Sequence, residues 1–147
     1  MKLTRAMADD LATRQKYIGE LVKWKRCGQS VDRHRFDVLV ACEDLDEPLR
    51  LTGYKGRKNW SYVLLTRGGI PLRKLTVHSG GHRNPDGSPA GSRHKHIWDP
   101  IDEDRWTYYP EDINFDDFNE GLIGFLKECN IECAALPEPL LVQRRLK

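Results

Sequence analysis

Residues 60–78 read WSYVLLTRGGIPLRKLTVH. Aromatic and branched apolar residues fill both halves of this stretch, and Arg67-Gly68-Gly69 separates the halves in the way that a tight turn does. The pattern predicts a β-hairpin with one strand on each side of the glycines, the second strand ending at His78.

The segments around this hairpin continue the sheet. Apolar residues alternate with other residues along them, which is the period of a half-buried strand. The predicted strands before and after the hairpin cover residues 36–42, 49–54, 93–98 and 105–109. A curved antiparallel sheet of four to six strands is therefore expected.

Two helices flank the predicted sheet in the sequence. An apolar stripe at helical spacing predicts an N-terminal helix over residues 9–27, which Gly28 would end. A second stripe, capped by Asn114 and ended by Asn130, predicts a C-terminal helix packed on one side of the sheet. The expected fold class is α+β.

The length of 147 residues suits one domain with a buried core. We expect a single domain over residues 1–147, with residues 1–8 and 137–147 extended or flexible. No apolar run approaches the ~20 residues of a membrane span, and no secretory signal follows Met1. The four cysteines lack zinc-site spacing. These features predict a cytoplasmic protein with reduced thiols and no membrane association; they do not indicate an oligomeric state.

Charge is unevenly distributed along the chain. Lys and Arg number 24 against 22 Asp and Glu, but residues 50–98 hold ten basic residues and one acidic residue. Residues 99–120 hold nine acidic residues and one basic residue. The basic block indicates an anionic partner such as nucleic acid or another phosphate-containing molecule. Two alternatives stay open: the blocks neutralise each other on the surface, or the acidic block mimics nucleic acid and binds a basic protein.

Histidines cluster in the same basic block. Four of the five fall within nineteen residues: His78, His82, His94 and His96. With Leu75 and Ile97 in the core, strand alternation predicts one sheet face that carries Lys74, Thr76, His78, His94, His96 and Trp98. His82 and Asp86 would lie above this face in the loop that joins the two strands.

Histidines among cations are typical of metal-independent phosphodiester cleavage, in which imidazoles act as acid and base while cations stabilise the phosphate. The predicted catalytic residues are His82, His94 and His96. The predicted substrate-binding residues are Lys74, His78, Arg83, Asn84, Asp86, Arg93 and Trp98. The leading hypothesis is a small phosphodiesterase or endoribonuclease, such as a toxin or a phage host-interaction factor. As exposed residues, His94 and His96 should tolerate replacement by alanine with a stability change within about 1 kcal/mol.

Three other interpretations of the cluster remain. No cofactor is predicted, but a metal held by His94 and His96, with His78, His82 or Asp86 completing the site, is an alternative. A non-catalytic site for nucleic acid, a nucleotide or a host protein is another, with Trp60, Trp98 or Tyr54 as a stacking platform. The histidines could also be an ordinary solvated strand face.

Two distant motifs carry a family resemblance. His82-Arg83-Asn84-Pro85-Asp86-Gly87 precedes His94-Lys95-His96-Ile97, and the C-terminal helix ends in Cys129-Asn130-Ile131. In these features the chain resembles an uncharacterised family of small prokaryotic and phage-encoded proteins. The resemblance covers roughly residues 30–135 and implies no established activity.

Overall fold

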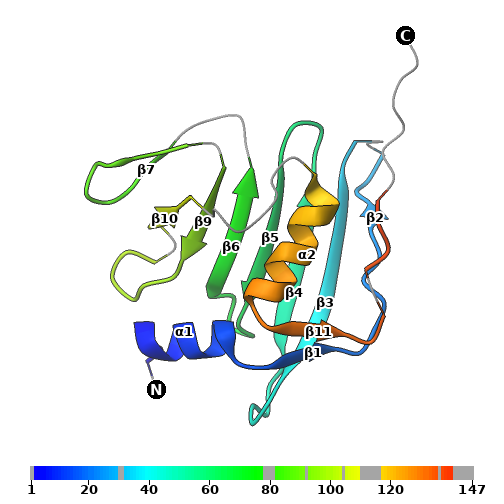
Figure 1. The fold of residues 1–147 in the computed structure, drawn as a ribbon, viewed down its shortest axis with the longest axis horizontal. Coiled ribbons are helices and arrows are strands. Elements are labelled where there is room, and N and C mark those ends of the chain that lie inside the picture. Colours follow the sequence, from blue (N-terminus) through cyan, green and yellow to red (C-terminus); the bar gives the residue numbers. More distant parts are fainter. Residues whose placement is uncertain are drawn as a thin grey trace.

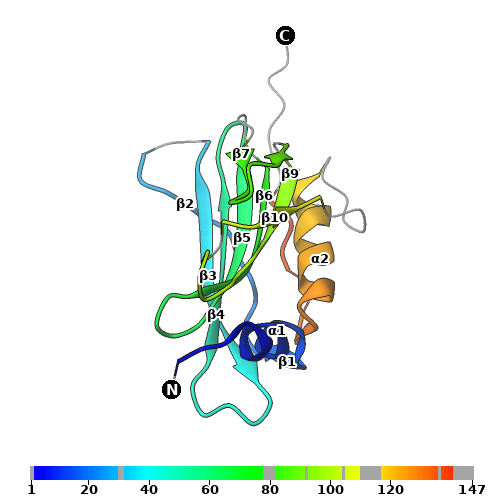
Figure 2. The ribbon, with the colours of Figure 1, turned by 90° about the vertical axis from the view of Figure 1, so that its left-hand side faces the viewer.

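The computed structural model describes residues 2–29, 32–77, 82–91, 93–103, 105–109, 117–135 and 137–140. In these residues a nine-stranded sheet forms the centre of the molecule. Helices α1 (Arg5–Thr13) and α2 (Phe118–Glu128) lie on one face of the sheet, the helix face (Figures 1 and 2). Neither described helix covers the opposite face, the outer face. The expected α+β class is confirmed.

The sheet has more strands than the four to six that were predicted. Its order is β10 (Thr107–Tyr108), β9 (Arg93–Ile97), β6 (Pro71–Val77), β5 (Trp60–Leu65), β4 (Leu49–Lys55), β3 (His34–Cys42), β1 (Lys16–Ile18) and β11 (Ile131–Cys133), while β2 (Lys25–Arg26) pairs with the start of β3. Only β1 and β11 pair in parallel among these strands. A separate hairpin joins β7 (His82–Arg83) to β8 (Pro89–Ala90). The unpredicted strands have three residues or fewer, too few to show alternation.

The central strands are the best predicted part of the molecule. Every second residue of β3, from Phe36 to Cys42, is buried on the helix face, as expected from the alternation. Strands β4, β5 and β6 continue this layer and contribute, among others, Leu51, Tyr62 and Leu75. Gly53 is required beside Phe36, since a Cβ there would lie 2.0 Å from the phenyl ring. The core therefore lies between the sheet and the two helices.

The N-terminal helix was predicted at the wrong place. Helix α1 begins after Thr4, whose side-chain oxygen accepts a hydrogen bond from the Met7 amide, and it ends at Thr13. Residues 5–8 are thus helical rather than extended, and residues 16–18 form β1 within the span predicted as helix. Pairing of β1 with both β3 and β11 outweighs the helical spacing of its apolar residues.

The C-terminal helix is confirmed with a later start. Asp117 caps α2, its carboxylate accepting a hydrogen bond from the Asn119 amide at 2.8 Å. The predicted cap, Asn114, lies outside the described residues. Asn130 ends the helix in the left-handed region at a φ of 54°, as predicted. Residues 137–140 are extended and are held by a pair of hydrogen bonds between Leu140 and Asn119.

Candidate anion-binding face

Strand register assembles a line of polar side chains on the outer face. Residues directly opposite one another in neighbouring strands point to the same side of a sheet. The pairings that link β2, β3, β4, β5, β6 and β9 define one cross-strand line, here called the polar row: Lys25, Arg35, Tyr54, Ser61, Thr76 and His94. This row runs at right angles to the strands and joins residues that are 69 positions apart in sequence.

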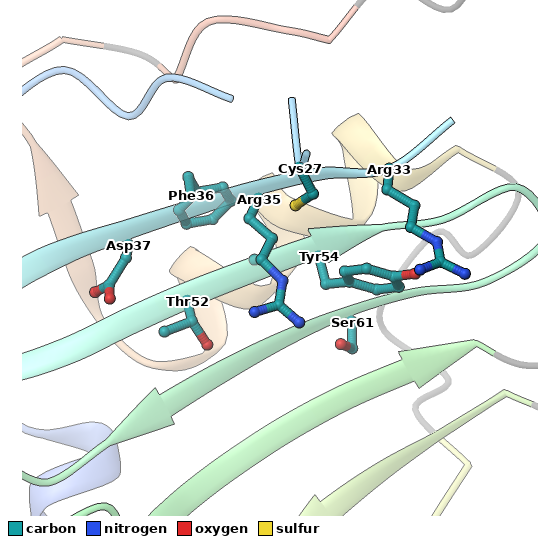
Figure 3. Close-up of a pocket in the computed structure, with 9 residues that line it drawn as sticks. Cys27, Arg33, Arg35, Phe36, Asp37, Thr52, Tyr54 and Ser61 are labelled. Atoms are coloured by element: carbon teal, nitrogen blue, oxygen red, sulfur yellow. The ribbon is translucent and has the colours of Figure 1, made fainter. Parts of the chain in front are cut away.

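Three residues of the polar row, Arg35, Tyr54 and Ser61, line a cavity of about 630 Å³. Figure 3 shows the Tyr54 ring between the side chains of Arg35 and Arg33, with Ser61 beside it. The Arg35 guanidinium carbon lies 5.6 Å from the centre of the Tyr54 ring, which is a cation–π distance. Thr52 adds a hydroxyl at the wall. The cavity thus combines two guanidinium groups, two aromatic rings (Phe36 and Tyr54) and the hydroxyls of Thr52, Tyr54 and Ser61.

The charge balance of this cavity is positive. Arg33, Arg35 and Lys25 are exposed. The one carboxylate in the lining belongs to Asp37, and its Oδ1 lies 2.9 Å from Nε of Arg50 in an ion pair. Because Arg50 already neutralises Asp37, the guanidinium groups of Arg33 and Arg35 give the lining a net positive charge. An anion would meet a net attractive field here.

The second half of the polar row has a different environment. His94 and His96 are on the outer face, as predicted, because they pair with Thr76 and Lys74 of β6. They are, however, only 2% and 9% exposed. The two rings lie 4.7 Å apart between centroids, edge to face, and Nδ1 of His94 lies 2.7 Å from the Gly91 carbonyl oxygen. The expectation that both histidines are exposed is therefore wrong.

The β7–β8 hairpin is tied to the sheet beside these histidines. Asn84 accepts hydrogen bonds from both the amide and the hydroxyl of Thr107, at 2.8 and 2.9 Å. Thr107 is the cross-strand neighbour of His96. Figure 1 places the hairpin at this edge of the sheet, beyond β9. The Asn-Pro-Asp-Gly motif therefore positions the hairpin against the histidine strand.

The turn of the hairpin is stabilised locally. The Asp86 carboxylate accepts hydrogen bonds from the hydroxyl and the amide of Ser88, and these bonds lower the pKa of Asp86. Arg83 donates from Nη1 to the Gly87 carbonyl oxygen at 3.0 Å. Asp86 and Arg83, both predicted as substrate-binding residues, thus make their hydrogen bonds within the turn.

The remaining predicted site residues are dispersed. Lys74 lies on the outer face beside His96, as expected. Arg93 pairs with Val77 and alternates with His94, so it lies on the other side of the sheet. Trp98 follows β9 and is 8% exposed. His78 lies outside the described residues, and of His82 only the backbone, in β7, is described.

Within the described part of the chain, no three His, Cys, Asp or Glu side chains form a group that could hold a metal ion. The cavity around Tyr54 can attract anions and provides an aromatic ring for stacking. Strand β9 carries a pair of buried imidazoles, those of His94 and His96. The residues that the sequence-based site omitted are Lys25, Arg33, Arg35, Thr52 and Ser61. Alternation along β4 is enough to place Thr52 and Tyr54 on the outer face. Which cations lie beside them depends on the pairing of β2 with β3 and of β3 with β4, and that register cannot be read from alternation.

The fold and site define an α+β protein with two helices on one face of a largely antiparallel sheet and a cationic, aromatic opposite face. Residues 3–131 match the model of a family of unknown function, DUF6978, so the chain belongs to that family. The expected membership of an uncharacterised family is confirmed. No curated protein and no solved structure matches the chain. Among the residues placed by the structure, no helix has the length and apolar character needed to cross a membrane.

Proposed function

We propose that the chain is a non-catalytic binding protein for nucleic acid, and that its binding site is the outer face around Tyr54. The observation that carries this proposal is the placement of Arg33 and Arg35 on either side of the Tyr54 ring in one cavity. Phosphate groups bind Arg in a bidentate, charge-assisted geometry. Base–aromatic stacking adds about 1–3 kcal/mol per base.

The cations of this site lie outside the basic block of residues 50–98. The pairing of β2 with β3 brings Lys25 beside Arg35 on the outer face, and Arg33, just before β3, lines the same cavity as Arg35. A site of this kind gains affinity by releasing counterions from phosphates, so its binding weakens steeply with salt. The hydroxyls of Thr52 and Ser61 at the wall can bond sugar or base edges.

Arg35→Glu tests the proposal. We expect this variant to bind a fluorescently labelled 12-nucleotide single strand at least tenfold more weakly in an anisotropy titration at low salt. The matched control is Lys127→Glu, which changes net charge equally on exposed α2, on the other side of the sheet, and should cost less than twofold. Equal losses in both variants, or no binding by the unaltered protein, would reject the site.

A histidine-dependent phosphodiesterase is the second candidate function. It is favoured by the 4.7 Å separation of the His94 and His96 rings, which would let one act as acid and the other as base on a single phosphate. It requires substrate to reach two rings that are 2% and 9% exposed. Cleavage of a labelled RNA that disappears in the double variant His94→Ala/His96→Ala, and persists in Arg93→Ala, would support it.

A further inference from the structure

We infer that the ligand is a single strand of nucleic acid that lies across the β-strands along the polar row, and that duplexes are excluded. This inference rests on the proposed function and specifies its substrate class. The observation behind it is the unbroken register from Lys25 through Arg35, Tyr54 and Ser61 to Thr76.

The polar row has the length of a short oligonucleotide. Neighbouring strands lie about 4.8 Å apart, so the four intervals from Lys25 to Thr76 span about 19 Å. Nucleotides that keep the 3.4 Å spacing of a stacked strand would number about five or six over this span, which is an upper bound because a base that stacks on Tyr54 is separated from a neighbouring base. That number falls within the range of roughly 4–16 nucleotides bound by single-strand-binding domains of another fold.

The side chains along the row change in character from one end to the other. Lys25 and Arg35 supply positive charge at the β2 end, and Tyr54 follows as a stacking surface. Ser61 then supplies a hydroxyl, whereas the hydroxyl oxygen of Thr76 is buried and does not face the ligand. A ring that stacks needs the open face of an unpaired base, which a duplex does not present because its bases stack on each other. The order of groups therefore selects a strand with accessible bases.

A further cation lies at the far end of the row. Lys74 is on the outer face of β6, two residues from Thr76 in the same strand. It is half-buried at this position. Lys74 can therefore contact a phosphate several nucleotides away from the one at Arg35, and a short ligand would reach only one of these cations. The residue of the row beyond Thr76 is His94, which is only 2% exposed, so a ligand cannot follow the row past this point.

A length series tests this inference. Binding of oligothymidylates and oligouridylates of one to ten nucleotides should strengthen up to about six and then change by less than twofold. A ten-base-pair duplex of mixed sequence should bind at least tenfold more weakly than either of its separate strands. The deoxy and ribo series distinguish DNA from RNA as the source of the strand.

Two variants connect the length dependence to the row. Lys74→Glu should weaken hexanucleotide binding at least fivefold and leave dinucleotide binding unchanged, whereas Arg35→Glu should weaken both. Lys74→Gln, with its unfolding midpoint measured alongside, separates loss of the cation from misfolding. Equal binding of duplex and single strand, or an unchanged hexanucleotide affinity in both Lys74 variants, overturns the inference while leaving the proposed function standing. Absence of binding to every ligand rejects both.

Discussion

The two ends of the polar row carry related chemistry in opposite environments. At the β2–β4 end, Arg35 of the row and the neighbouring Arg33 are exposed beside a cavity. At the β9 end, His94 and the adjacent His96 are nearly fully buried and contact each other, and the His94 ring is hydrogen-bonded to Gly91, the residue after β8. Both ends lie on the same sheet face, so the face alone does not determine whether a side chain can meet a ligand.

This difference assigns separate roles to the two ends. Exposed guanidinium groups gain little stability from their neighbours and are available to an anion. Buried imidazoles with hydrogen-bonded partners contribute to the packing of the hairpin against the sheet. The two buried histidines, which were the most conspicuous motif in the sequence, are therefore better placed to stabilise the edge of the sheet than to contact a substrate.

Truncation of side chains at both ends tests whether the histidines are structural and Arg35 is not. We expect His94→Ala and His96→Ala each to lower the free energy of unfolding by about 1–3 kcal/mol, because each removes a buried polar group from its partners. Arg35→Ala, an exposed substitution, should change it by no more than about 0.5 kcal/mol. Urea titrations followed by tryptophan fluorescence measure all three. Losses below about 0.5 kcal/mol for both histidines would show that they are exposed in solution and would favour the phosphodiesterase.

A smaller effect is expected from the residue that ties the hairpin to β10. Asn84→Ala removes the acceptor for the amide and the hydroxyl of Thr107, which should cost about 1–2 kcal/mol. It should also speed hydrogen exchange at the Thr107 amide. Asp86→Ala, in the same hairpin, is the control because its bonds stay within the turn. Equal exchange at Thr107 in the two variants would mean that Asn84 does not fasten the hairpin.

The sequence was sufficient for the parts of the fold in which local pattern and tertiary contacts agree. The alternation in β3 and β4 and the Gly-Gly turn before β6 gave both the strands and their inward faces. Residues 16–18 were misassigned because Ile18 fits a helical stripe, while its strand conformation depends on pairing with β11, more than a hundred residues away. Such distant pairings leave no periodic signal in a three-residue strand.

The candidate site shows the same limit. The sheet face of His94, His96 and Lys74 followed from alternation and was predicted correctly. Burial of the histidines could not be predicted this way, because it depends on where the hairpin docks. The cavity around Tyr54 was missed for a related reason: Arg35 and Tyr54 become neighbours only through the β3–β4 register. Periodicity identifies the face of a side chain, and register identifies its neighbours.

Lys16 is a cation in a third environment, and its effect on stability is the smallest that we predict. Lys16 is 1% exposed, and its ammonium group donates hydrogen bonds to the carbonyl oxygens of Arg14 and Cys129, both at 2.7 Å. It therefore stabilises the C-terminal end of α2, where the helix dipole favours a positive charge. Burial lowers the pKa of Lys16 to about 8. As pH rises, Lys16 therefore loses its proton in the folded protein before it does so in the unfolded chain.

The pH dependence of stability follows from that difference. Between pH 8 and the ordinary lysine pKa, the unfolded chain binds more protons than the folded protein, so the free energy of unfolding rises with pH. From pH 8 to 9 the rise should be on the order of 1 kcal/mol. Burial raises the pKa of Cys129 to about 12 and also raises the pKa of Cys42 and Cys133, so these thiols act in the opposite direction from about pH 8 upward. Urea titrations under reducing conditions at pH 8 and 9 isolate the contribution of Lys16: the change in the free energy of unfolding between the two pH values should be more positive, by on the order of 1 kcal/mol, in the unaltered protein and in Lys25→Met than in Lys16→Met. The same change in all three proteins would show that Lys16 does not contribute to the pH dependence.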